Sequence, residues 1–134
     1  MREILFRGKN DRGEWIVGFY IKDAIETYIY DKHRNTRMQS VAPETVGQYT
    51  GLDKNGTKIF EGDVGRYKQT DGVKENGKPI ICTGKVIYNE KTASYAVESK
   101  DEKGRKYFDY FPINDFEIIG NIHDNPELLE GGVK

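Results

Sequence analysis

Two histidines are the residues of this chain best suited to acid–base chemistry. His123 precedes Asp124, and an imidazole beside a carboxylate is an arrangement that general acid–base catalysis uses. His33 lies in a polar, basic segment. The chain has no His-Glu-x-x-His or Cys-x-x-Cys spacing, no Gly-x-Ser-x-Gly elbow and no Walker-type phosphate loop. We therefore expect His123 to be a turn residue capped by Asp124 or Asn125. We also expect that the protein is not an enzyme and that it has no catalytic residue, metal site or cofactor.

Two further groups could carry chemistry and are better explained by structure. Glu61 and Asp63 flank Gly62, and glycine between polar residues is typical of a tight turn with positive φ. We expect both carboxylates to be solvated turn residues rather than a catalytic pair. The single cysteine, Cys82, lies in an apolar, strand-like run, which predicts a buried structural thiol rather than a nucleophile.

A basic and aromatic segment near the C-terminus is the candidate binding surface. Its residues are Arg105, Lys106, Tyr107, Phe108 and Tyr110. Small barrels bind single-stranded nucleic acid by stacking bases on aromatic rings beside cations. A similar segment places Tyr28 and Tyr30 before Lys32, Arg34 and Arg37. The alternative is that the rings are core and the cations solvated, which a net charge of −1 favours. Solvent exposure of the rings from Tyr107 to Phe111 distinguishes these interpretations.

Composition indicates a small β protein that associates with copies of itself. The chain has 134 residues, of which 36% are hydrophobic and 32% charged, so the core is thin. Fifteen glycines and nine tyrosines suit short strands joined by tight turns. Residues 2–12 carry four basic and two acidic side chains, whereas residues 115–130 carry five acidic and no basic ones. Charged termini are more often simply solvated, but polarised termini and a thin core also suit self-association or partner docking, and a homo-oligomer is expected.

The local pattern predicts four hairpin turns and a boundary near the middle of the chain. Charged or amide residues precede Gly13, Gly56, Gly77 and Gly104, and strand-like runs follow each of them. The predicted strands are 3–7, 15–21, 27–31, 39–41, 57–60, 64–68, 80–88, 94–99, 106–111 and 116–122. We expect an N-terminal β unit at 1–50 and a five-stranded small barrel at 51–134. A polar loop is predicted at 68–78, and a short helical turn after Asn125 as N-cap.

The chain carries no signal-like apolar run and no stretch of transmembrane length. One cysteine excludes an intramolecular disulfide and fits a reducing compartment. We therefore expect a cytoplasmic protein without a membrane partner.

Four motifs in one order resemble the YopX family. They are Met1–Lys9 with Gly13–Phe19, then Pro43–Leu52, Ile59–Val64 and Glu117–Leu129, and they span nearly the whole chain. The resemblance implies a mostly-β phage or prophage protein whose C-terminal part is similar to an SH3-type barrel, and it brings no established activity. The function expected is that of a non-enzymatic accessory protein in the bacterial host cell, which contacts itself or a host or phage protein. The alternative is a nucleic-acid-binding small-barrel module.

Overall fold

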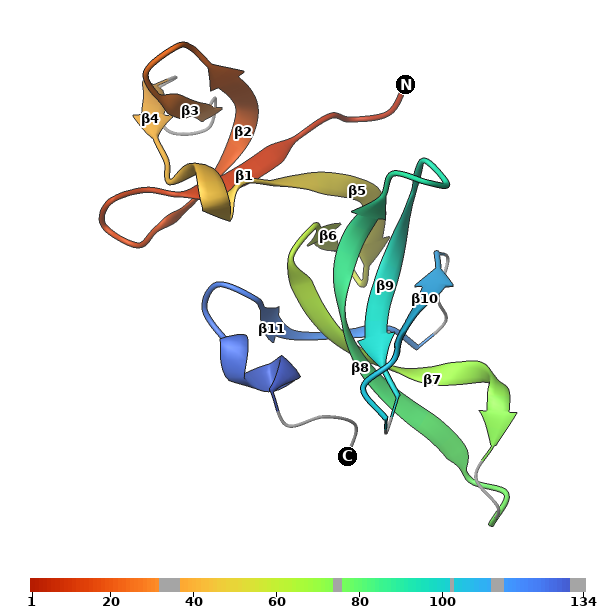
Figure 1. The fold of residues 1–134 in the computed structure, drawn as a ribbon. Helices are drawn as coiled ribbons and strands as arrows, with labels where there is room; N and C mark the ends of the chain where they lie inside the picture. Colours follow the sequence, from red (N-terminus) through yellow and green to blue (C-terminus); the bar gives the residue numbers. More distant parts are fainter. Residues whose placement is uncertain (32–36, 74–75, 102, 112–114, 131–134) are drawn as a thin grey trace. The chain divides into compact units, whose positions relative to one another are not determined.

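The computed structural model describes residues 1–31, 37–73, 76–101, 103–111 and 115–130, and these form two compact units, Met1–Phe60 and Glu61–Lys134. The protein is mainly β, as predicted (Figure 1). The strands are β1 Phe6–Lys9, β2 Trp15–Lys22, β3 Thr27–Asp31, β4 Arg37–Ser40, β5 Gly47–Lys54, β6 Thr57–Phe60, β7 Asp63–Val73, β8 Pro79–Asn89, β9 Ser94–Lys100, β10 Lys106–Tyr110 and β11 Glu117–Asn121. Two short 3₁₀ helices, η1 Pro43–Thr45 and η2 Pro126–Leu129, complete the described part.

The first unit is one antiparallel sheet with the strand order β4-β3-β2-β1-β5-β6. Its core has two clusters: one of Ile16, Ile29 and Val41, the other of Leu5, Tyr49 and Phe60. Gly18 allows β2 to approach β3, since a Cβ at this position would lie 1.9 Å from the Tyr30 carbonyl oxygen.

Strand β5 is absent from the sequence prediction, which treated this segment as a boundary region. Pro43, Gly47 and Gly51 are loop signals, but Gly47 and Gln48 pair with β1 and the end of β5 pairs with β6. The β5–β6 hairpin turns at Asn55 and Gly56, with φ of 51° and 83°, as its Asn-Gly pair predicted. Because the hairpin belongs to the first sheet, contacts divide the chain after Phe60, whereas the predicted division lies between residues 50 and 51.

The second unit is a five-stranded antiparallel sheet with the order β10-β9-β8-β7-β11. Tyr67 on β7 donates a hydrogen bond to Asp109 on β10 over 2.5 Å, although β8 and β9 lie between these strands. In a flat sheet, strands three positions apart are about 14 Å apart, which is more than these two side chains and their hydrogen bond span, so this sheet is curled. The curl and the strand order are consistent with an SH3-type small barrel.

The other three predicted turns join consecutive antiparallel strands, and Gly13, Gly77 and Gly104 have φ of 77° to 78°. The polar segment 68–78 is not a loop throughout. Strand β7 continues to Val73, which pairs with Pro79 on β8, because the ladder supplies the backbone hydrogen bonds that composition alone does not reveal.

The C-terminal turn is a 3₁₀ helix that begins at Pro126 with Asn125 at the N-cap position, as predicted. Asn125 makes no side-chain cap to η2. Its Oδ1 instead accepts a hydrogen bond from the Asn121 N–H at 3.3 Å, which folds the turn back onto β11. Leu128 covers Gly120, where a Cβ would lie 2.8 Å from the leucine Cδ1. No helix in the described part of the chain is long and apolar enough to cross a membrane.

Candidate functional site

The histidine and carboxylate that could act as an acid–base pair are turn residues. Asn121 Oδ1 accepts hydrogen bonds from the backbone N–H groups of His123 and Asp124, at 3.0 and 2.9 Å. The Asn121 amide also donates to Asp124 Oδ2 at 3.0 Å. The capping residue of this turn is therefore Asn121, not Asp124 or Asn125 as the sequence suggested. His33 lies outside the described residues.

The carboxylates around Gly62 do not both lie in solvent as expected. Gly62 has the predicted positive φ, at 91°. Its backbone is bonded on both sides, because its N–H donates to the Val86 carbonyl and its own carbonyl accepts from the Ile122 N–H, each at 2.9 Å. These bonds draw the turn into the sheet, so that Asp63, the first residue of β7, is buried while Glu61 is half-buried.

Cys82 is buried, as predicted, within a polar cluster on the inner face of the second sheet. Its Sγ lies 3.0 Å from the Tyr107 hydroxyl. The Tyr67 hydroxyl lies 2.8 Å from the Ser99 hydroxyl and donates to Asp109. Burial raises the pKa of the Cys82 thiol above its ordinary value, which opposes formation of the reactive thiolate. This cluster therefore joins strands rather than supplying a nucleophile.

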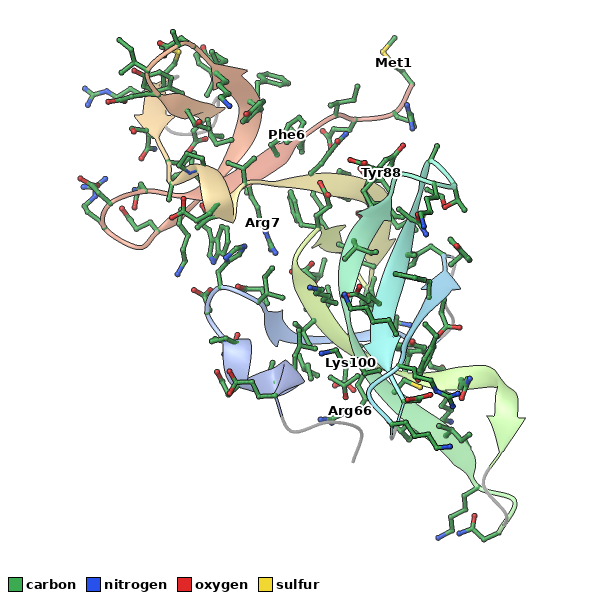
Figure 2. The ribbon with its side chains drawn as sticks, viewed as in Figure 1. Met1, Phe6, Arg7, Arg66, Tyr88 and Lys100 are labelled. Atoms are coloured by element: carbon green, nitrogen blue, oxygen red, sulfur yellow. The ribbon has the colours of Figure 1, made fainter. Side chains whose placement is uncertain are left out.

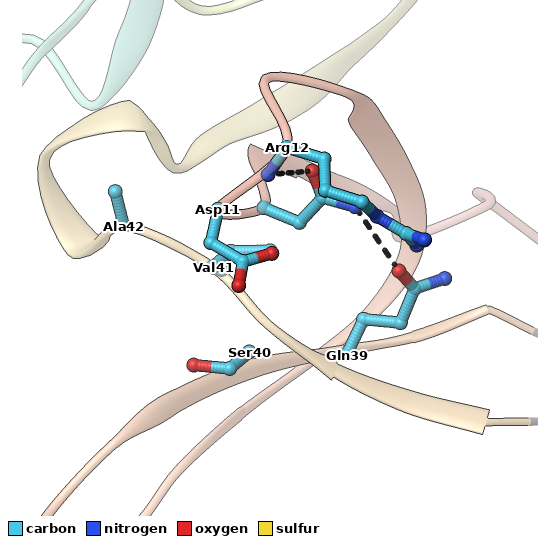
Figure 3. Close-up of a pocket in the computed structure, with 7 residues that line it drawn as sticks. Asp11, Arg12, Gln39, Ser40, Val41 and Ala42 are labelled. Atoms are coloured by element: carbon cyan, nitrogen blue, oxygen red, sulfur yellow. Dashed lines mark hydrogen bonds between the residues drawn. The ribbon is translucent and has the colours of Figure 1, made fainter.

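A pocket of about 440 Å³ lies in the first unit, lined by residues 10–12 and 39–42 (Figure 3). Asn10 Oδ1 accepts hydrogen bonds from the N–H groups of Arg12 and Glu14, and its amide donates to the Gln39 and Glu14 side chains. The polar capacity of Asn10 is thus used to hold the β1–β2 loop against β4. Asp11 and Ser40 also line the pocket, and the seven lining residues include no histidine, cysteine or lysine.

Strand β10 holds the remaining candidate residues except Arg105, which directly precedes it, and the strand lies at an edge of the second sheet (Figure 1). Side chains alternate between the faces of a strand, which places Lys106, Phe108 and Tyr110 on one face. All three are exposed, with 40% of Phe108 and 47% of Tyr110 accessible to solvent. The structure separates Tyr107 from them, because its hydroxyl contacts Cys82 on the inner face. Phe111 is half-buried, with its ring 5.6 Å from that of Phe116.

The cations around β10 are held by carboxylates. Lys106 Nζ lies 3.6 Å from Glu98 Oε1, and Lys85 Nζ lies 3.3 Å from Glu98 Oε2. Arg105 Nε donates to Asp101 Oδ2 over 2.7 Å. The second unit as a whole contains eleven basic and fourteen acidic residues, a formal net charge of −3. A polyanion would have to compete with these carboxylates for the cations of β10.

The first unit carries an apolar row that was not predicted, in which Phe19 and Met38 are exposed and Tyr30 between them is half-buried. Phe19, Tyr30 and Met38 are opposite one another on β2, β3 and β4, and the rings of Phe19 and Tyr30 stack with centroids 6.4 Å apart. Arg37 is adjacent to Met38 along β4, and alternation places it on the opposite face. The ring–cation arrangement predicted for Tyr30 and Arg37 is therefore not formed, while Lys32 and Arg34 lie outside the described residues. The run Phe19-Tyr20-Ile21, apolar on both faces, was the available signal.

Metal chemistry has no evident centre in the described part of the chain, where no three His, Cys, Asp or Glu side chains gather closely enough to hold an ion. No curated protein and no solved structure matches the chain significantly. The family model described as YopX protein matches residues 2–130, which is nearly the whole chain. The chain therefore belongs to the YopX family.

Proposed function

We propose that this chain is a non-enzymatic accessory protein of a phage or prophage, acting through protein contacts in the cytoplasm of the bacterial host. The observation that carries the proposal is the edge strand β10, where Phe108 and Tyr110 are exposed beside Lys106. Aromatic side chains are enriched in the buried centre of protein interfaces, and an open strand edge offers backbone hydrogen bonds to a partner.

The charges of this surface support a protein partner over a nucleic acid. Affinity for nucleic acid comes largely from cations that neutralise phosphates. Here Lys106 shares Glu98 with Lys85, and Arg105 is paired with Asp101. A protein partner can leave these ion pairs in place at the rim of the contact and bury the rings of Phe108 and Tyr110.

A nucleic-acid-binding module is the second candidate, because one specific observation favours it. One alternating set of side chains on β10 is exposed together with a lysine, which is the arrangement that base stacking requires. In this alternative a single strand would lie along β10, with bases against Phe108 and Tyr110, and binding would weaken steeply with salt.

Light scattering with a mixed-sequence single-stranded oligonucleotide, at low and at high salt, separates these functions. We expect no change in mass on adding the oligonucleotide. Salt-sensitive binding that is lost in Phe108→Ser, which removes the ring without adding a charge, would refute the protein-contact function. A complementary capture experiment uses Phe108→Lys against Tyr88→Lys, a matched control because Tyr88 is 43% exposed and lies on β8 (Figure 2). We expect a protein partner to be retained by wild type and by the control, and lost by Phe108→Lys.

A further inference from the structure

Strand β10 has an open edge whose hydrogen-bonding groups can be assigned from its pairing with β9. The Asp101 N–H donates to the Arg105 carbonyl at 3.0 Å at the start of the β9–β10 hairpin. Bonded and non-bonded pairs alternate along an antiparallel ladder, so Tyr107 and Asp109 are the residues of β10 that exchange backbone bonds with β9. The N–H and C=O groups of Lys106, Phe108 and Tyr110 therefore point away from β9, towards the open edge.

This pattern is self-complementary. We infer that a second copy of this chain pairs antiparallel with the open edge of β10, with a two-fold axis at Phe108. This inference rests on the proposed function, because it identifies the protein partner as another copy of the chain. In this register Phe108 faces Phe108 of the second copy, and Lys106 faces Tyr110 in both directions. Every outward-pointing N–H of these residues then meets an outward-pointing C=O of the other copy.

Two other registers, which also have the axis at a residue whose backbone groups point outward, are worse. An axis at Lys106 places two lysine side chains directly opposite each other, which is unfavourable for like charges. An axis at Tyr110 leaves Phe108 and Lys106 with no residue of the second β10 opposite them, because the strand ends at Tyr110. The axis at Phe108 avoids both defects and places an ammonium group beside an aromatic ring at each end of the ladder, which is a cation–π arrangement.

The expected assembly is a weak, concentration-dependent dimer. A ladder of a few residues buries less surface than a permanent dimer interface requires. A lysine on an edge strand can also prevent that strand from pairing with a strand of another molecule. This is the competing explanation for the presence of Lys106 on β10. A monomer at all concentrations would support that explanation and overturn the self-pairing.

Two substitutions at Tyr110 test the register. Tyr110→Glu places a carboxylate opposite Lys106 of the second copy, whereas Tyr110→Lys places an ammonium group there. Opposite charges across a ladder attract and like charges repel, and the pair occurs twice in the dimer, so the Glu variant should dimerise on the order of tenfold more tightly than the Lys variant. The gap should shrink at high salt. Sedimentation equilibrium gives the dissociation constants.

Controls keep the experiment decisive. Tyr88→Glu and Tyr88→Lys make the same changes at a similarly exposed tyrosine on β8, and they should not differ from each other. Equal effects of Glu and Lys at residue 110 would refute the register. If a variant fails to fold, hydrogen exchange of the wild-type Phe108 amide answers the same question, since its protection should rise with protein concentration. A monomeric protein that still captures a partner through β10 refutes the self-pairing and leaves the proposed function standing, whereas oligonucleotide binding refutes the function.

Discussion

Adding one methyl group at Gly65 should destabilise the second unit markedly. Gly65 lies on β7 at the point where the strand crosses the Phe116 ring, and a Cβ there would lie 2.1 Å from Phe116 Cζ and 2.2 Å from Cε2. The ring cannot move away easily, because Phe116 is 1% exposed and the rings of Tyr67 and Phe111 pack against it at 6.2 and 5.6 Å. Gly65 is not among the glycines with positive φ, so the effect is steric.

The magnitude follows from two opposing effects. Overpacking a well-filled core costs about 1–3 kcal/mol, and this clash involves a closed ring contact, which places it near the upper end. Replacing glycine by alanine within a strand recovers about 0.5–1 kcal/mol of backbone entropy. We therefore expect Gly65→Ala to lower the free energy of unfolding by about 2 kcal/mol, or Tm by roughly 8–16 °C for a unit of this size.

Urea unfolding of the whole chain, followed by far-ultraviolet circular dichroism, measures this loss. Fluorescence of Trp15, the single tryptophan, reports on the first unit and shows whether both units unfold together. Phe116→Leu shortens the opposing side chain and provides the rescue: the double variant should lose less than the sum of the two single variants. A Gly65→Ala protein as stable as wild type, or strictly additive losses in the double variant, would show that the close approach is not a real constraint.

Three further predictions concern turns and buried tyrosines. Gly62→Val should lower stability by about 1–3 kcal/mol in the same urea assay, because valine is strained at a φ of 91°. Tyr67→Phe should cost about 1–3 kcal/mol, since Asp109 and Ser99 lose the hydroxyl between them, and an unchanged midpoint would contradict the cluster. Burial raises the pKa of Tyr67 above 10.0, so in alkaline solution the native state keeps a proton that the unfolded chain loses. The free energy of unfolding should therefore be unaffected by this group below pH 10.0 and should fall as the pH rises above it. The fall should be less steep in Tyr67→Phe.

Local signals explain which parts of the fold could be predicted. The four glycine-bearing turns were predicted correctly because positive φ is a property of one or two residues, and strand β3 matches its predicted range of 27–31. Strand β5 was missed because its backbone bonds come from β1 and β6, while its own glycines indicate a loop. The N-cap position of η2 was predicted correctly, but the Asn125 side chain does not bond to the helix because its Oδ1 accepts from the Asn121 N–H instead.

The candidate surface was predicted as a segment but not as a face. Alternation along β10 was visible in the sequence, yet both sets of alternating residues contain aromatic side chains. Which set lies inside depends on Cys82 and Tyr67, which are 25 and 42 residues away from their partners on β10. No local pattern contains that information, so Tyr107 was grouped with Phe108 until the structure separated them.

The inner polar cluster therefore determines the outer surface of β10. A slip of one residue in strand pairing would exchange the two faces, placing Tyr107 and Asp109 outside and Phe108 inside. The hydrogen bond from Tyr67 to Asp109 and the contact between Cys82 and Tyr107 oppose such a slip, because both would be lost. Burying Lys106 on the inner face would add the cost of desolvating a charge. The same contacts leave the backbone groups of Lys106, Phe108 and Tyr110 pointing to the open edge, so the polar interior sets both the side chains and the hydrogen bonds that a partner meets.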